Sequence, residues 1–494
     1  MNLFKETPFF IKSLFFFIIT FYIFFYIQFS VPWLVGYDGF FHIKYSAILA
    51  EKGYIEKLPW LQYTIHKDAY RDHHLLFHYL IVPFTYGNLM LGGKYATVLF
   101  ASFMGLSLYI LLNSAGVRLP SLWSFAAIMS SHPFLFRMSL LRVQSLSLAA
   151  LLLIFLFCMK RQYLLIYISS VLFVWLYDAF PLLIIFSLVF IVSGWLVEKR
   201  PDMKIFYMTL LGIVTGLVIN PYFPGNVTSL IYNISRTFLE NPSGIQLGSE
   251  WKPYQTWDFV RNSLPVFLVF PLTILFLPMI KNIKREEYAS VCLSLLFLFM
   301  TFKSRRFVEY WPVFAFLSAS LVVGRRVSWK FILAGFILLL PLMNYNFKEA
   351  VSESSTSTSP ENYMGSAKWL EKNTSAGDIV FNADWDDFPF LFFYNSKNYY
   401  IVGLDPMYLY SYDKDKSALY RKITKGQKYE PGRLIIEEFN SRYVFLDKDH
   451  DSLYKRLTDD PIATKVFEDS GGYVFKLSPK NDKPQSKQDD KIKQ

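Results

Sequence analysis

The stretch FFIKSLFFFIITFYIFFYIQF, residues 9–29, decides the fold class. A helix that crosses a bilayer needs about 20 mostly apolar residues, because its backbone groups must bond to one another where water is absent. Lys5 and Lys12 lie at the start of the stretch, as in a secretory signal peptide, but no small-residue cleavage site ends it. We therefore expect a retained membrane span.

The whole chain has the composition of a membrane protein. Of its 494 residues, 53% are hydrophobic, 19% aromatic and only 18% charged, whereas an ordinary soluble domain has about 25% charged residues. The net charge of +11 belongs to the apolar part, because residues 1–345 hold 28 Lys and Arg against 15 Asp and Glu. Basic residues beside apolar runs indicate membrane topology, so no nucleic-acid partner is expected.

Apolar runs of suitable length follow one another along the first 345 residues. The candidate spans are 9–29, 75–91, 95–114, 119–136, 145–159, 163–178, 179–197, 205–221, 264–280, 288–302, 307–324 and 329–345. Four charged linkers, each separated from the next by two runs, should lie on one side, and their excess of Lys and Arg makes that side cytoplasmic. These linkers are 160–161, 198–204, 281–286 and 325–330.

The run 75–91 is the weakest of these candidates, because Pro83 and several glycines interrupt it. We expect it to be an interfacial or re-entrant helix, which leaves about eleven spans with the N-terminus inside and the C-terminus outside. The alternative is that 75–91 crosses and the N-terminus lies outside.

The expected architecture is a polytopic α-helical membrane domain, residues 1–345, with outer loops 30–94 and 222–263. Residues 346–477 combine helical patterns (363–373 and 452–457) with strand patterns (378–381, 399–402, 442–446 and 472–477), which predicts an extracytoplasmic α/β domain. Residues 478–494, rich in Lys, Asp and Gln, predict a disordered tail. The expected location is the plasma membrane, which in a bacterium is the inner membrane.

The first outer loop concentrates the ionisable side chains. Five of the seven histidines lie there, together with Asp38, just past the first span; they are His42, His66, His73, His74 and His78. A carboxylate at the outer membrane face can deprotonate an acceptor hydroxyl or hold a divalent cation, so Asp38 is the candidate catalytic residue. The alternative is that Asp38 only caps the helix that follows. His42, His73 and His74 are candidates for binding substrate.

Two histidines of this loop, His74 and His78, are four residues apart and would share a helical face. That spacing permits metal ligation, with Asp38 and His74 as candidate ligands. The structural alternative is a pair of interfacial histidines that bond to their neighbours.

Arginines lie on the outer side, against the positive-inside bias. Arg137 and Arg142 border the loop around 132–144, while Arg305 and Arg306 end a later span. Guanidinium groups bind phosphate oxygens through paired donors, so these four residues are candidates for holding a donor phosphate. The alternative is an internal ion pair, for instance with Glu309 or Asp178.

The second long outer loop contains Gly248-Ser-Glu-Trp-Lys-Pro-Tyr254. A carboxylate beside aromatic rings is common where sugars are held, and equally common at membrane interfaces. Glu250 and Trp251 are therefore further candidates for binding substrate.

Together these features resemble the C-type (GT-C) membrane glycosyltransferases, and within them the oligosaccharyltransferase catalytic subunits. The resemblance covers the layout of most of the chain. At residue level it depends on Tyr37-Asp-Gly-Phe-Phe-His42, which is similar to the family's first-loop Asp motif, and on Trp385-Asp386, which match the family's Trp-Trp-Asp-Tyr-Gly motif. It implies transfer of a sugar from a polyprenyl-phosphate or diphosphate carrier, with inversion, and implies substrate contacts for Trp385 and Asp386.

Two departures from the family pattern bear on the chemistry. Only Trp385 and Asp386 match the pentapeptide, which puts recognition of a peptide acceptor in doubt. Residues 132–145 contain no Asp or Glu where the family has metal-binding carboxylates, and they present Arg137 and Arg142 instead. This favours an enzyme without a metal cofactor, in which arginines neutralise the leaving phosphate; Mg²⁺ or Mn²⁺ is the alternative.

The leading functional hypothesis is an inverting glycosyltransferase that uses a lipid-linked sugar donor and acts on an extracytoplasmic glycan, lipid or protein. The first alternative is a metal-dependent oligosaccharyltransferase that acts on protein. The second is a non-catalytic transporter or envelope assembly factor, which would place its ionisable groups near the middle of the membrane.

Overall fold

The computed structural model describes residues 8–239, 245 and 248–478, and the chain forms two compact units. The helical unit comprises residues up to Ile55 and Arg71–Thr358, and the C-terminal unit comprises Glu56–Tyr70 and the residues from Ser359 onward. Glu56–Tyr70, which the sequence assigns to the outer loop 30–94 of the membrane domain, thus packs within the C-terminal unit. The predicted tail, apart from Ser478, lies outside the described residues.

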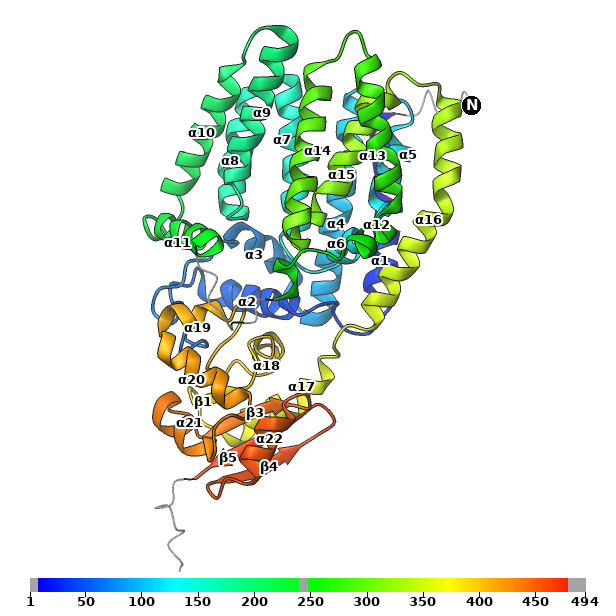
Figure 1. Cartoon of the computed structure of the whole chain (residues 1–494). Helices are drawn as coiled ribbons and strands as arrows, with labels where there is room; N and C mark the ends of the chain where they lie inside the picture. Colours follow the sequence, from blue (N-terminus) through cyan, green and yellow to red (C-terminus); the bar gives the residue numbers. More distant parts are fainter. Residues whose placement is uncertain (1–7, 240–244, 246–247, 479–494) are drawn as a thin grey trace, which may run out of the picture. The chain divides into compact units, whose positions relative to one another are not determined.

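The helical unit consists of helices that lie side by side along much of their length (Figure 1). In chain order they are α1 (Phe9–Gln28), α2 (Asp38–Lys52), α3 (Leu75–Ile81), α4 (Leu89–Ser114), α5 (Pro120–Met129), α6 (His132–Met138), α7 (Gln144–Lys160), α8 (Tyr163–Leu176), α9 (Pro181–Glu198), α10 (Met203–Val218), α11 (Gly225–Leu239), α12 (Thr256–Asn262), α13 (Leu264–Phe276), α14 (Arg285–Lys303), α15 (Trp311–Ala319) and α16 (Trp329–Ser355). Short 3₁₀ turns η2 (Ser249–Trp251) and η4 (Arg305–Glu309) precede α12 and α15.

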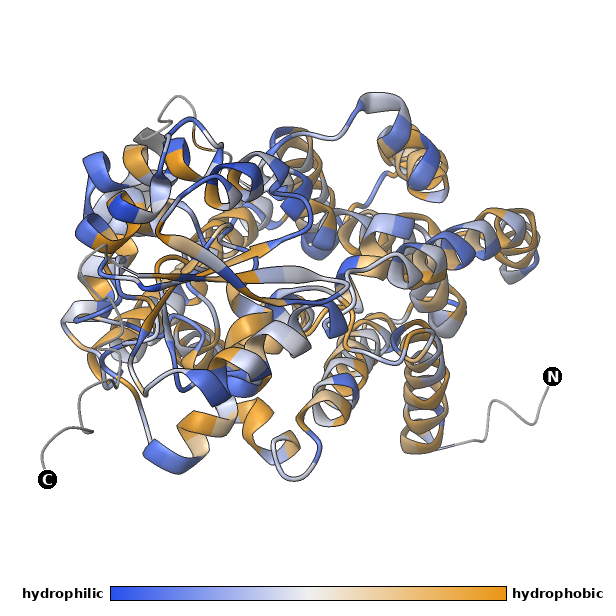
Figure 2. Cartoon of the chain, turned by 90° about the horizontal axis from the view of Figure 1, so that it is seen from below, coloured by the Kyte–Doolittle hydropathy of each residue, from blue (hydrophilic) through white to orange (hydrophobic). Residues whose placement is uncertain are grey.

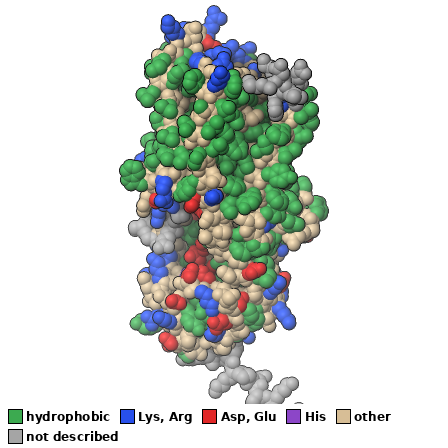
Figure 3. Space-filling view, turned by 90° about the vertical axis from the view of Figure 1, so that its right-hand side faces the viewer, with side chains coloured by type: hydrophobic (Ala, Val, Ile, Leu, Met, Phe, Trp, Pro, Cys, Tyr) green, Lys and Arg blue, Asp and Glu red, His purple; other side chains and the backbone are tan. Residues whose placement is uncertain are grey.

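Apolar residues dominate these helices (Figure 2), and they cover the surface around α16 (Figure 3). Phe331, Ile337 and Leu338 of α16 are more than half exposed, which costs little in lipid and much in water. Among the described residues, α1, α4, α9 and α16 are long and apolar enough to cross a membrane, and the bent pair α12–α13 makes a fifth candidate. These findings support a membrane protein, while the count of eleven spans stays a prediction.

Several predicted spans are broken or shortened in the structure. The run 119–136 divides into α5, which ends at Met129, and α6, whose N-cap Ser131 has an extended backbone and accepts a hydrogen bond from the backbone of Phe134. The run 75–91 yields only α3 and a 3₁₀ turn, Val82–Phe84. Ten helical residues extend about 15 Å, half of the hydrocarbon thickness, so this segment is too short to cross as a helix.

The last helix of the unit runs past the predicted boundary at residue 345. α16 continues to Ser355 because Met343, Asn346, Ala350 and Ser354 form one buried stripe at helical spacing. The helical unit therefore ends at Thr358.

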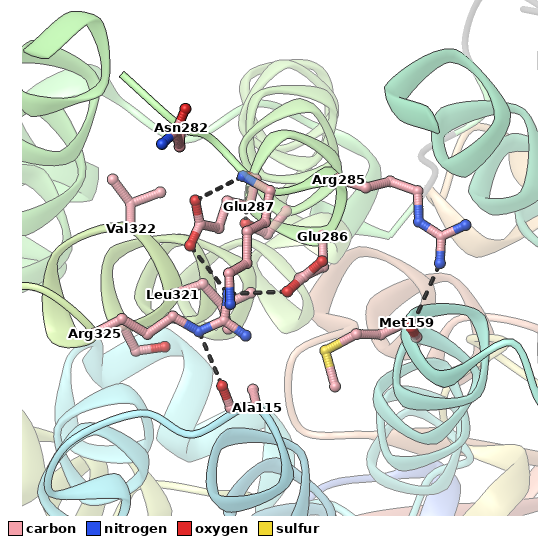
Figure 4. Close-up of polar contacts among 12 residues, drawn as sticks. Ala115, Met159, Asn282, Arg285, Glu286, Glu287, Leu321, Val322 and Arg325 are labelled. Carbon is pink, nitrogen blue, oxygen red and sulfur yellow. Dashed lines mark hydrogen bonds and ion pairs between the residues drawn. The ribbon is translucent and has the colours of Figure 1, made fainter. Parts of the chain in front are cut away.

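One end of the helical unit is joined by a buried network of ion pairs (Figure 4). The fully buried Glu287 accepts hydrogen bonds from Arg325 (3.0 Å) and Arg326 (2.8 Å). Arg325 also donates to Glu286 at 2.9 Å, and Arg285 bonds to Asp202 at 3.4 Å. Together with the Arg161–Asp202 pair (3.2 Å), these contacts bring the four charged linkers to the same end, as the alternation of spans predicts.

The C-terminal unit is built on a five-stranded mixed sheet of order β2-β1-β3-β5-β4. Its strands are β1 (Ile379–Asn382), β2 (Tyr399–Tyr400), β3 (Tyr443–Asp447), β4 (Ala463–Glu468) and β5 (Gly472–Leu477). β1 pairs in parallel with β2 and β3, and β5 pairs antiparallel with β3 and β4. Within the same unit, the backbone N–H of Gln62 donates to the carbonyl of Tyr400 at 2.9 Å, so the segment 56–70 extends the β2 edge.

Helices surround the sheet: α17 (Glu361–Asn373), α18 (Phe388–Tyr394), α19 (Met407–Tyr412), α20 (Lys414–Thr424), α21 (Pro431–Phe439) and α22 (Asp451–Thr458). The predicted strands at 378–381, 442–446 and 472–477 are confirmed to within a residue, and the helices at 363–373 and 452–457 to within two residues, whereas the predicted strand 399–402 is shortened to Tyr399–Tyr400. The sequence misses β4 and helices α18 to α21.

Candidate active site

Helix α2 holds the two side chains from which the site is built. Asp38 is its first residue and His42 lies one turn later, so the two side chains emerge from the same face. The N-cap position belongs to Tyr37, and no side chain caps the helix. The alternative role of Asp38 as a helix cap is therefore wrong, and its carboxylate is directed to another partner.

That partner is Arg142, which precedes α7. Nη2 of Arg142 lies 2.6 Å from Oδ2 of Asp38, and Nη1 lies 2.5 Å from Oε1 of Glu250. One guanidinium thus bridges two carboxylates that are separated by 212 residues in the sequence. Asp38 of the first outer loop and Arg142 of the loop around 132–144 therefore meet at one place, and Glu250 of the outer loop 222–263 joins them.

The turn η2 positions Glu250 through contacts with η4. Ser304 Oγ donates to the carbonyl of Glu250 at 2.8 Å, and the backbone N–H of Arg305 donates to the carbonyl of Lys252 at 3.1 Å. Glu250 then faces Arg142, Arg137 (3.2 Å) and Arg306 (3.7 Å). Burial acts to raise the pKa of Glu250, but the three arginines outweigh it and hold the pKa well below its ordinary value, so Glu250 is ionised.

Arg137, in α6, is more deeply buried than Arg142. Its Nε donates to Oε1 of Glu309 at 2.6 Å, and its Nη1 lies 3.2 Å from Glu250. The internal ion pair with Glu309, which the sequence offers as an alternative to phosphate binding, is thus present. Arg137 serves to hold Glu250 and Glu309 in place.

The two arginines of η4 have different surroundings. Arg306 lies over the ring of Trp251 at 4.6 Å and beside Glu250, with about a third of its side chain exposed. Arg305 lies over Tyr254 at 5.2 Å and donates to the carbonyl of Pro253 at 3.3 Å. Among the described residues, Arg306 joins the carboxylate cluster and Arg305 does not.

The histidines of the first outer loop have different partners. Nδ1 of His42 lies 2.8 Å from Nε2 of His78, whose Nδ1 lies 2.7 Å from Oδ2 of Asp72. His74 stacks on Tyr177 with ring centroids 5.4 Å apart, and the ring of His73 lies tilted against that of His74 with centroids 4.1 Å apart. His66 belongs to the C-terminal unit.

Burial lowers the pKa of both His42 and His74, and neighbouring histidines lower each further by charge repulsion. Both rings are therefore neutral at neutral pH. The sequence points to these histidines by their clustering, but it does not indicate that Asp72 and His78 form a chain with His42.

The candidate metal ligands do not fit a metal site. In the part of the chain that the structure describes, no three His, Cys, Asp or Glu side chains are arranged to hold an ion. The guanidinium of Arg142 lies where a cation shared by Asp38 and Glu250 would have to lie. His74 and His78 turn to different partners, which agrees with the structural alternative for this pair.

Trp385 and Asp386 lie in the C-terminal unit, in the turn between β1 and α18. There they belong to an acidic group in which Asp387 accepts a hydrogen bond from the backbone of Asp384 at 3.0 Å. Burial and the charge of Asp384 raise the pKa of Asp386 to about 7. Their predicted contact with substrate stays a prediction.

No protein-family model matches the sequence, and no curated protein sequence matches it significantly. Solved structures do match. The Archaeoglobus fulgidus oligosaccharyltransferase in its apo form has a TM-score of 0.68 at 13% identity, over 96% of this chain and 75% of that one. Apo ArnT from Cupriavidus metallidurans has a TM-score of 0.62 at 14% identity, over 94% and 97%. Arabinofuranosyltransferase AftD from Mycobacteria has a TM-score of 0.59 at 11% identity, over 95% of this chain and 40% of that one.

These three proteins are GT-C membrane glycosyltransferases. The chain has the GT-C fold and resembles the oligosaccharyltransferases, so the resemblance predicted from the sequence is confirmed, while the number of spans and their topology stay predictions. At such low identity the likeness establishes the fold alone, and the reaction must be argued from the site.

Proposed function

We propose that the chain is a membrane glycosyltransferase that moves a sugar from a polyprenyl-phosphate type carrier to an extracytoplasmic acceptor. The observation that carries the proposal is the cluster in which Arg142 joins Asp38 to Glu250 while Arg306 lies beside it. Carboxylate and guanidinium groups that meet at one site are the two kinds of group that a displacement at a glycosyl phosphate requires.

The phosphate group of the carrier would bind to the arginines of the cluster. Arg306 is the most exposed of the three arginines in the cluster, and its 3.7 Å contact with Glu250 is the longest in the group. A phosphate can therefore approach Arg306 without breaking the shorter pairs of Arg137 and Arg142. Neutralising the phosphate as it leaves lowers the barrier, because charge develops there in the transition state.

The acceptor would approach along the face of α2. Asp38, one-third exposed and held by Arg142, can accept a hydrogen bond from the acceptor and orient its hydroxyl. The acceptor oxygen then bonds to the anomeric carbon while the bond from that carbon to the phosphate oxygen breaks. Displacement in one step inverts the anomeric centre, which is the stereochemistry we propose.

The comparisons support a lipid-linked donor. One structure of the Archaeoglobus fulgidus enzyme contains dolichol-phosphate with an inhibitory peptide, and one structure of ArnT contains undecaprenyl phosphate. By this likeness we propose a plasma-membrane location, with the C-terminal unit and the Asp38 cluster on the extracytoplasmic side.

The cluster does not favour a metal-dependent oligosaccharyltransferase. The Archaeoglobus fulgidus enzyme has been crystallised with Zn and sulfate, whereas here a guanidinium lies between the two carboxylates best placed to share an ion. A transporter is also disfavoured, because the charges gather around outer-loop residues and not along the middle of the spans.

The proposal is tested with undecaprenyl phosphate and protein reconstituted in lipid nanodiscs. Native mass spectrometry should detect a bound carrier, and Arg306→Met should weaken binding about 10- to 150-fold, since a charge-assisted contact with phosphate contributes about 1.5–3 kcal/mol. The matched control is Arg118→Met, because the Arg118 guanidinium donates to the carbonyls of Arg326 and Val327 at the other end of the unit. Equal binding by both variants would contradict the proposed phosphate site.

A further inference from the structure

A buried chain of three side chains leads to the reactive face of α2. Asp72 and His78 are almost fully buried, and Oδ2 of Asp72 lies 2.7 Å from Nδ1 of His78. Nε2 of His78 lies 2.8 Å from Nδ1 of His42. The other oxygen of Asp72 accepts the backbone N–H of His74 at 2.9 Å, which fixes the carboxylate.

The hydrogen bonds among these three side chains determine which of their atoms carry protons. A carboxylate only accepts, so Nδ1 of His78 must carry a hydrogen. When both histidines are neutral, Nε2 of His78 is an acceptor, and Nδ1 of His42 must donate to it. This leaves Nε2 of His42 with a lone pair.

That lone pair is available to a ligand. No described residue forms a hydrogen bond to Nε2 of His42, although Nδ1 of the same ring is engaged. His42 lies one helical turn after Asp38, and Arg142 is close enough to lower the pKa of His42 by charge repulsion, after the larger effects of burial and His78. The free nitrogen thus belongs to the same site as the Asp38–Arg142 pair.

Asp38 is less suited to receive a proton. Its Oδ2 is engaged at 2.6 Å by a guanidinium that cannot give up its own proton. A proton on Asp38 would break this pair, whereas a proton on His42 has a path away from the site.

We propose that His42 is the general base of the reaction and that His78 and Asp72 are positioning residues that accept the resulting charge. This inference depends on the proposed glycosyl transfer. Nε2 of His42 removes the proton from the acceptor hydroxyl as the oxygen bonds to the anomeric carbon, and the carrier phosphate leaves with the electron pair of the broken bond. The hydrogen on Nδ1 of His42 moves to Nε2 of His78, so that the positive charge rests on His78 beside the carboxylate of Asp72.

A first test needs no substrate. In protein labelled with ¹⁵N-histidine and reconstituted in lipid, solid-state NMR at neutral pH should show His42 protonated at Nδ1 and unprotonated at Nε2, with its signal assigned by its loss in His42→Gln. Protonation at Nε2 would overturn the proposal whether or not the protein transfers sugar. If His42→Gln does not fold, Asp72→Asn provides the second measurement, because it should change the tautomer of His78.

A second test follows the reaction as release of free polyprenyl carrier from the lipid-linked sugars of the host membranes. His42→Gln should slow release about 10²–10⁴-fold, the usual contribution of a general base, while undecaprenyl phosphate still binds. Asp72→Asn should shift the acid limb of the rate profile to lower pH, because the protonated chain loses its carboxylate. The groups that face His42 in this profile are Asp38, His73, His74, His78 and Arg142.

The outcomes separate the two proposals. If the unaltered protein binds no undecaprenyl phosphate and releases no carrier, the proposed function is wrong. If it does both, but His42→Gln retains the rate within a few-fold or Asp72→Asn leaves the acid limb unchanged, the proton chain is wrong and the glycosyl transfer stands.

Discussion

The pairing of Asp38 with Arg142 makes a quantitative prediction about stability. Two unit charges about 4 Å apart interact by about 4 kcal/mol at the effective dielectric constant of a protein surface. Asp38 is one-third exposed, and Arg142 keeps Glu250 as a second partner, so we expect about half of that energy to appear as coupling. The expected coupling free energy is about 2 kcal/mol, a factor of about 30 in the unfolding equilibrium.

A double-mutant cycle measures this coupling. The variants Arg142→Met, Asp38→Asn and the combination are unfolded in mixed micelles, and their free energies of unfolding are compared. Arg142→Met alone should cost about 3 kcal/mol, because it leaves two carboxylates without their shared partner. The combination should cost less than the sum of the single changes by about 2 kcal/mol.

The matched control combines Asp38→Asn with Arg305→Met. Arg305 contacts Tyr254 and the carbonyl of Pro253, so the free energies of these two changes should add within about 0.5 kcal/mol. If the Asp38–Arg142 cycle is equally additive, the two side chains do not interact in the membrane, and the argument for a shared site fails.

Three further results are expected. Glu287→Gln should destabilise the protein by about 2–3 kcal/mol, because it removes the charged partner that Arg325 and Arg326 share, although Arg325 keeps Glu286; unfolding in mixed micelles measures this, and a change below about 1 kcal/mol would contradict the network. Since burial lowers the pKa of His42 and His74 in the folded protein, the unfolded chain takes up protons that the folded chain does not as the pH falls below about 6.5. The thermal midpoint should therefore be lower at pH 5.5 than at pH 7.5, and a higher midpoint in acid would refute the assignment. Carrier release should be unaffected by EDTA. If EDTA abolished carrier release and added Mn²⁺ restored it, a metal would take part in the reaction.

The sequence predicts most helices of the membrane unit because their apolar runs are long, although it misses α11 and α12. It does not predict where a run breaks, since α5 ends at Met129 and Ser131 caps the start of α6 through a single hydrogen bond. It also misses β4, an edge strand whose residues Ala463–Glu468 are mostly half-buried or exposed and lack the alternation on which strand prediction depends.

The site could be predicted by residue type but not by partner. Ionisable groups beside membrane spans are costly, and this singles out Asp38, Arg142 and Glu250. Their pairing depends on how three distant loops fold together, which no local pattern encodes. For the same reason the sequence leaves the roles of Arg305 and Arg306 equal, although only the second lies beside Glu250.

We infer that this cluster binds the phosphate of a lipid carrier. An experimental structure of the protein in nanodiscs with undecaprenyl phosphate tests it most directly. We expect phosphate oxygens within hydrogen-bond distance of the Arg306 guanidinium, with Asp38, Arg142 and Glu250 still joined beside it. A phosphate bound elsewhere, with no contact to the cluster, would show that the cluster does not bind the carrier.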